Sequence, residues 1–170
     1  MKQIYILRHA KSDWDSPYDS DMERGLSHRG KTQTKALRNY LKESGFEFDL
    51  ALVSPAERTK RTYANLRKEV LRLPKPDFRD SLYESEKEDL LFLLHGLSPS
   101  VRSVCIVGHN PGLEDLANGL LFGENLGNRF QKFPTASFLG LSFSEDSWKD
   151  IDWGTCKLSV FWIPGSIGKE

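Results

Sequence analysis

The chain has 170 residues, a length at which a single domain with a full hydrophobic core is the usual organisation. Lysine plus arginine and aspartate plus glutamate both number 24, so no overall field attracts the protein to nucleic acid or to an anionic membrane. No apolar stretch approaches the roughly 18 residues that a membrane span requires, so we expect neither membrane nor nucleic-acid partners.

The two cysteines, Cys105 and Cys156, lie in apolar segments and lack the spacing of metal ligands. This pattern is typical of packed thiols in a reducing compartment. The N-terminus enters an apolar strand at once, without the longer apolar segment and cleavage site of a secretory signal. A cytoplasmic location is therefore expected.

The first half of the chain predicts two strands, each followed by a helix. Residues 2–8 form the first strand, and a polar loop rich in aspartate follows it. The first helix is expected to start after Ser27, whose hydroxyl suits an N-cap, and to end at Gly45. A second strand, residues 50–53, leads into Ser54-Pro55-Ala56-Glu57, which matches a capping box with proline as the first helical residue. Arg58 is thus expected in the first turn of the second helix.

The second half continues this alternation and then changes to strands. Residues 71–76 are expected to connect to a short edge strand near Phe78. A third helix over residues 86–95 contains more leucine than one face needs, which predicts a well-buried helix. The strand over residues 103–108 precedes Asn110-Pro111, expected to be the N-cap and first residue of a fourth helix over residues 113–121. Two further strands, 137–143 and 155–163, are expected to pair.

Strands that alternate with amphipathic helices predict an α/β fold. We expect a three-layer αβα sandwich with a mainly parallel central sheet. Residues 1–164 are predicted to form one domain, and residues 165–170 a frayed tail.

Basic side chains follow three of the predicted strands, at the edge where open α/β sheets place their ligands. Arg8 and His9 follow the first strand, Arg58 the second and His109 the fourth. The planar fork of arginine suits phosphate oxygens, and nearby positive charge favours a neutral, nucleophilic imidazole. The sequence therefore predicts a phosphate pocket that needs no metal and no cofactor. The aspartates of the loop over residues 13–21 are interpreted as solvated side chains.

These motifs resemble the histidine phosphatase (phosphoglycerate mutase-like) superfamily. The resemblance is carried by Arg-His-Ala after the first strand, Ser-Pro-x-x-Arg-Thr after the second, and Gly-His-Asn-Pro near the fourth. The stretches over residues 7–14, 21–30 and 82–84 resemble more closely the small phosphohistidine phosphatases of the SixA type. The similarity spans essentially the whole chain.

Carried over by position, the resemblance implies that His9 is the nucleophile and becomes transiently phosphorylated. It implies that Arg8, Arg58 and His109 hold the phosphoryl oxygens. Arg24 lies in the loop that approaches the phosphate in small members of the family, so it is a substrate-binding candidate. A salt bridge between Arg24 and Asp21 is the other interpretation.

The general acid is the weakest part of the pattern. Larger relatives use a glutamate, or a His-Asp pair at the second histidine, whereas Asn110 follows His109 here. Glu84 is the remaining candidate, and a surface carboxylate at the head of the third helix is the alternative. Because an imidazole can depart already protonated, the absence of a strong acid favours phosphohistidine over a phosphate ester.

We therefore expect a phosphatase that acts on phosphohistidine carried by a protein. A phosphatase or mutase for small phosphorylated substrates is the alternative among enzymes. A non-catalytic module that binds phosphate or phosphoproteins is the alternative of another class.

Overall fold

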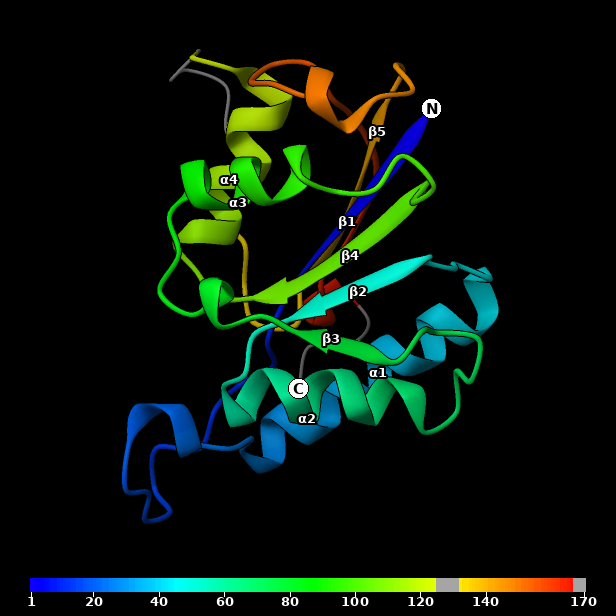
Figure 1. The fold of residues 1–170 in the computed structure, drawn as a ribbon. Coiled ribbons are helices and arrows are strands. Elements are labelled where there is room, and N and C mark those ends of the chain that lie inside the picture. Colours follow the sequence, from blue (N-terminus) through cyan, green and yellow to red (C-terminus); the bar gives the residue numbers. More distant parts are fainter. Residues whose placement is uncertain (125–131, 167–170) are drawn as a thin grey trace.

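A central sheet divides the molecule into two helical layers (Figure 1). The computed structural model describes residues 1–124 and 132–166, which contain a six-stranded sheet in the order β3-β2-β4-β1-β5-β6. The strands are β1 (Lys2–Arg8), β2 (Leu50–Val53), β3 (Pro76–Phe78), β4 (Ser103–Gly108), β5 (Phe138–Phe143) and β6 (Lys157–Trp162).

Four neighbouring strands, β3, β2, β4 and β1, run parallel, whereas β5 and β6 join antiparallel. This topology confirms the predicted mainly parallel sheet, the short edge strand at Phe78 and the pairing of the last two strands. Parallel strands place their carboxyl ends at one edge of the sheet. The residues that follow β1, β2 and β4 therefore meet there.

The helices cover the sheet in two pairs, which confirms the three-layer αβα sandwich (Figure 1). Helices α1 (His28–Ser44) and α2 (Glu57–Arg67) cover one face, and α3 (Lys87–His95) and α4 (Gly112–Phe122) cover the other. A hydrophobic core lies on each face of the sheet, and alternate residues of β1 pack into the two cores. Tyr5 and Leu7 pack on the side of α1 and α2, and Ile4 and Ile6 pack on the side of α3 and α4. Burial on both faces explains why this strand is apolar without interruption.

The limits of α1 agree with the predicted caps. Ser27 Oγ accepts a hydrogen bond from the Gly30 amide at 3.1 Å, and Gly45 ends the helix with a φ of 74°. The start of α1 also lies against the loop that follows β1, because a Cβ on Gly30 would lie 2.1 Å from the Lys11 carbonyl oxygen. This contact holds the loop close to the sheet edge.

Two predicted helix starts are wrong. Helix α2 begins at Glu57 after Ala56, because the Lys60 amide donates to the Ala56 carbonyl, so Ser54 is not its N-cap. Helix α4 begins at Gly112 with Pro111 as its N-cap, so Asn110 is not the N-cap and Pro111 is not the first helical residue. Arg58 nevertheless lies in the first turn of α2, as predicted.

The predicted burial of α3 is also wrong. Only Leu90 and Leu94 of this helix are buried, and Phe92 is 80 % exposed. These two leucines are four residues apart and form a single stripe, which is what a surface helix needs.

A short 3-10 helix covers Pro164–Ser166, and the rest of the predicted tail, residues 167–170, lies outside the described residues. None of the helices within 1–124 and 132–166 is long and apolar enough to cross a membrane.

Candidate active site

The pairing of β1 with β4 brings the two predicted histidines together. Arg8 is the register partner of Gly108, and the His9 amide donates to the Gly108 carbonyl at 3.1 Å. His9 and His109 therefore leave adjacent strands side by side, with ring centroids 5.3 Å apart. The expected convergence of these residues at one sheet edge is confirmed.

Arg58 reaches the same edge from α2. Its side chain is 8 % exposed, and Thr62 on the next helical turn accepts a hydrogen bond from the Ala10 amide at 3.0 Å. The Thr62 hydroxyl in turn donates to the Arg58 carbonyl at 2.7 Å. This chain of hydrogen bonds fixes α2 against the segment that carries His9.

His9 is held in one tautomer. Its Nδ1 lies 2.7 Å from the Ala10 carbonyl oxygen, which can only accept, so Nδ1 carries the proton. Burial, reinforced by the positive charges of Arg58 and Arg8, lowers the pKa of His9 to about 4. The ring is therefore neutral near pH 7, and the lone pair of Nε2 is free to attack phosphorus.

His109 is oriented by Ser54, a role that the sequence did not reveal. Ser54 Oγ lies 2.8 Å from His109 Nε2, so Nδ1 is the ring nitrogen left for a ligand. Burial, followed by the influence of His9 and Arg58, lowers the pKa of His109 to about 3. The motif Ser-Pro suggested a helix cap, and only the β2–β4 pairing shows that Ser54 lies beside His109.

Arg8 is half-buried and anchored at the end of β1. Its Nη1 donates to the Phe133 carbonyl at 2.9 Å, and the Asn110 amide group donates to the same oxygen at 3.0 Å. Asn110 Oδ1 also accepts from the Glu114 amide, so this side chain does stabilise the start of α4. Arg8 Nε is buried and lacks a hydrogen-bond partner within residues 1–124 and 132–166. A buried unpaired guanidinium N–H is costly, which favours an anionic ligand here.

Asp21 is bound within the site, which corrects the prediction that the aspartates of this loop are all solvated. Its carboxylate accepts from Arg58 Nη2 at 3.0 Å and from the Tyr83 hydroxyl at 2.5 Å, and it also pairs with Arg24. The Asp21 carbonyl accepts from Arg58 Nη1 at 2.8 Å. Tyr83 first, then Arg24 and Arg58, hold the pKa of Asp21 well below its usual range.

Both interpretations of Arg24 are realised together. Arg24 forms the predicted salt bridge to Asp21, and it also lines the pocket with 4 % exposure. Its Nη1 donates to Ser12 Oγ at 2.8 Å, and its Cζ lies 3.5 Å from the ring centre of Trp14. Like Arg8, it has a buried Nε without a partner in the described part of the chain.

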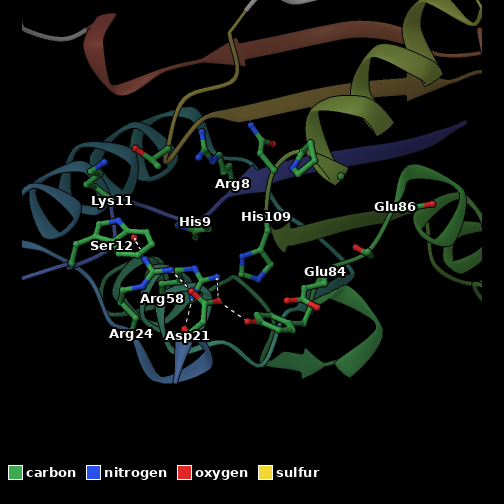
Figure 2. A pocket seen from close by; sticks show the side chains of 17 residues that line it. Arg8, His9, Lys11, Ser12, Asp21, Arg24, Arg58, Glu84, Glu86 and His109 are labelled. Atoms are coloured by element: carbon green, nitrogen blue, oxygen red, sulfur yellow. Dashed lines mark hydrogen bonds and ion pairs between the residues drawn. The ribbon is translucent and has the colours of Figure 1, made fainter. Parts of the chain in front are cut away.

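Glu84 also lines the pocket, on the opposite side from Arg24 (Figure 2). Its backbone is left-handed, with a φ of 59°, which costs a non-glycine residue about 1 to 2 kcal/mol. Such strain is concentrated at functional sites. Glu84 is nevertheless exposed and does not pair with either histidine in the described hydrogen bonds. The predicted residues thus form two sets. Arg8, His9, Arg58 and His109 form a basic centre, and Glu84 lies at the periphery of the pocket.

The complete pocket has a volume of about 580 Å³ (Figure 2). Arg8, His9, Arg58 and His109 gather around it, with Asp21 and Arg24 at the loop side. No group of three or more metal-ligating side chains occurs in the ranges 1–124 and 132–166. The arrangement offers two or three guanidinium groups to phosphate oxygens and a neutral imidazole to phosphorus.

The depressed histidine pKa values predict an acid-sensitive fold. An unfolded histidine titrates near 6.5, so between about pH 6.5 and pH 4 the unfolded chain binds more protons than the folded one. Stability is expected to fall as the pH drops through this window, before the contribution of Asp21 is lost at lower pH. The thermal midpoint measured at pH 7 and at pH 4.5 checks this.

In that experiment the variant His9→Gln/His109→Gln should lose less of its thermal midpoint than the parent protein. His28→Gln, which removes an exposed histidine at the start of α1, is the matched control and should behave like the parent. An equal loss in the parent and in the double variant contradicts the assignment.

Comparisons with known proteins agree with this geometry. The sequence profile of the histidine phosphatase superfamily (branch 1) matches residues 4–87, which include most of β1 and all of α2. An uncharacterised chloroplastic protein of Arabidopsis thaliana is 27 % identical over 88 % of this chain and 70 % of its own length. A 2,3-bisphosphoglycerate-dependent phosphoglycerate mutase of Bartonella henselae is 30 % identical, over 38 % of this chain and 32 % of its own.

Solved structures extend the similarity through His109 to the C-terminal strands. A structure described as phosphohistidine phosphatase SixA of Agrobacterium tumefaciens aligns with a TM-score of 0.79 and 26 % identity, over 96 % of this chain and 98 % of its own. A SixA protein histidine phosphatase complexed with tungstate aligns with a TM-score of 0.79 and 23 % identity, over 98 % and 99 % of the two chains. The profile match, the shared fold and the paired histidines together show that the chain belongs to the histidine phosphatase superfamily.

Proposed function

We propose that the chain is a metal-independent phosphatase that uses His9 as its nucleophile and acts on phosphohistidine carried by a protein. The observation that carries this proposal is the state of His9. Its Nδ1 is tied to the Ala10 carbonyl, its pKa is about 4, and it lies between Arg8 and Arg58. A neutral nucleophile among fixed positive charges is what phosphoryl transfer requires.

The reaction has two steps. In the first, His9 Nε2 forms a bond to phosphorus while the bond from phosphorus to the substrate imidazole breaks. The departing imidazole keeps the proton on its other nitrogen and leaves as a neutral ring. In the second, water attacks the phosphohistidine at His9, the P–N bond breaks, and phosphate and a proton are released. Arg8, Arg58 and His109 hold the phosphoryl oxygens in both steps.

Two observations support a phosphohistidine substrate. Asn110 occupies the place after His109 where a leaving-group acid is carried in larger relatives, and its side chain is bound to the Phe133 carbonyl and the Glu114 amide. Imidazole needs less protonation than an alkoxide. The fold is also shared with a SixA protein histidine phosphatase that binds tungstate, a tetrahedral oxyanion shaped like phosphate.

A phosphatase or mutase for small phosphate esters is the second candidate, and the strained backbone of Glu84 favours it. A glutamate held in the left-handed region on the pocket wall is suited to protonate an alkoxide. If Glu84 has this role, Glu84→Gln lowers turnover of an alkyl phosphate strongly and turnover of phosphohistidine hardly at all.

The test compares kcat/KM for a phosphohistidine peptide, a panel of sugar phosphates and an aryl phosphate, for the parent protein and Glu84→Gln. We expect the phosphohistidine peptide to be preferred and its turnover to change less than about threefold in the variant. A clear preference for sugar phosphates, lost in Glu84→Gln, overturns the substrate choice in favour of the ester phosphatase. No turnover of any donor, with no acid-labile label on His9, favours the phosphate-binding module instead.

A further inference from the structure

A second hollow lies between α1 and α2 and does not share a lining residue with the phosphate pocket. It has a volume of about 460 Å³, and we name it the basic groove. Its described lining residues include no carboxylate. They include five cationic side chains: Lys31, Lys35, Arg38, Arg61 and Lys68. Because the whole chain is neutral, this is a local concentration of positive charge.

Nearby carboxylates offset only part of this charge. Arg38 pairs with Glu69 at 2.9 Å, and Arg61 pairs with Glu57 at 2.9 Å. Glu69 is shared with Lys42, at 3.1 Å, which lies outside the basic groove. The three lysines of the basic groove are exposed and have no ion pair in the described part of the chain: Lys31, Lys35 and Lys68. The basic groove therefore carries excess positive charge.

Two segments of the chain contribute residues to both the phosphate pocket and the basic groove, which are therefore neighbours. On α2, Arg58 lines the pocket and Arg61 lines the basic groove, as does Lys68, which directly follows the helix. Lys68 lies ten positions after Arg58, which corresponds to about 15 Å along the helix axis. In the loop before α1, Arg24 lines the pocket, and a Cβ on the next residue, Gly25, would lie 3.2 Å from Arg61 Nη1. Cationic side chains thus extend from the pocket toward the space between α1 and α2.

We propose that the basic groove binds an acidic segment, rich in aspartate and glutamate, of the protein that carries the phosphohistidine. This inference rests on the proposed function. A path of about 15 Å matches four or five residues of extended chain. A substrate protein whose phosphohistidine enters the pocket can therefore lay a short acidic stretch across Arg61, Lys35 and Lys68.

The lining of the basic groove distinguishes this ligand from other polyanions. It contains no aromatic side chain among its described residues, and binding of single-stranded nucleic acid depends on such stacking surfaces. Leu26 is its only apolar member among those residues, so the basic groove lacks the apolar face with which an amphipathic element inserts into a membrane surface. Carboxylates of a peptide need only the ammonium and guanidinium groups that are present.

Direct binding tests the proposal without any need for turnover. A fluorescently labelled peptide of eight residues, rich in aspartate and glutamate and without phosphate, is titrated with the parent protein at low salt. The change in anisotropy reports the Kd. Lys35→Gln/Lys68→Gln is expected to weaken binding about tenfold, as expected for the loss of two partly solvated ion pairs. Lys149→Gln/Lys157→Gln removes the same charge at exposed positions outside the basic groove and is the matched control.

Three outcomes overturn the docking proposal: no binding of the peptide to the parent, equal weakening in both double variants, or tighter binding of a single-stranded oligonucleotide of equal charge. If binding weakens only in Lys35→Gln/Lys68→Gln, binding of an acidic segment by the basic groove is supported even if the proposed catalytic function fails. A phosphohistidine peptide with acidic flanks should then show about a tenfold higher KM in this variant. Its kcat, and its turnover of an aryl phosphate, should be unchanged.

Discussion

His9→Ala is expected to lower turnover of an aryl phosphate by at least about 10³-fold, because the variant lacks the atom that bonds to phosphorus. The remaining guanidinium groups still bind the phosphoryl group, so KM should change much less than kcat. Steady-state kinetics at pH 7 separate the two constants.

A trapping experiment gives the same residue a chemical signature. A rapid quench with a ³²P-labelled donor should leave an acid-labile, alkali-stable label on the parent protein and none on His9→Ala. His28→Ala, at an exposed position on α1, is the matched control and should be labelled like the parent. Turnover by His9→Ala at the parent rate contradicts the phosphohistidine mechanism. It also contradicts both enzyme candidates, because both depend on that mechanism.

The basic centre could be predicted because it depends on topology that the sequence makes plain. Apolar runs that alternate with helices require parallel strands, and parallel strands bring their carboxyl ends to one edge. Arg8, His9 and His109 directly follow strands, so their convergence needed no further information. Arg58 lies in the first turn of the helix that follows β2. Its place at this edge could therefore be predicted, although the helix starts at Glu57 and Ser54 is not its N-cap.

The supporting residues could not be predicted because their partners are distant in the sequence. The hydroxyl of Ser54 satisfies the statistics of a helix cap, but the pairing of β2 with β4 gives it His109, 55 residues away, as a partner. Asp21 lies in a polar loop, where solvation is the usual state of an aspartate. Its hydrogen bond to Tyr83 spans 62 residues. Local pattern carries no information on such contacts, which arise only when loops close over the sheet edge.

Arg58 and Asp21 are expected to act as a unit, and a double-mutant cycle measures this. Arg58→Ala removes a guanidinium from the pocket and should lower kcat/KM by about 10²- to 10³-fold. Asp21→Asn keeps the shape of the side chain but weakens its hold on Arg58 Nη2, Arg24 and the Tyr83 hydroxyl. Because Asp21 acts on the phosphate through the arginines, its loss should cost about tenfold, mainly in KM.

In the Arg58→Ala background, the same Asp21→Asn change should cost no more than about threefold, since one of the two arginines through which Asp21 acts has gone. The inhibition constant of inorganic phosphate, measured for all four proteins, should follow the same pattern. Asp19→Asn, at an exposed position of the same loop, is the matched control and should leave every constant unchanged. Fully additive losses contradict the coupling, and tighter phosphate binding by Asp21→Asn reverses it: Asp21 then competes with phosphate for the arginines and does not position them.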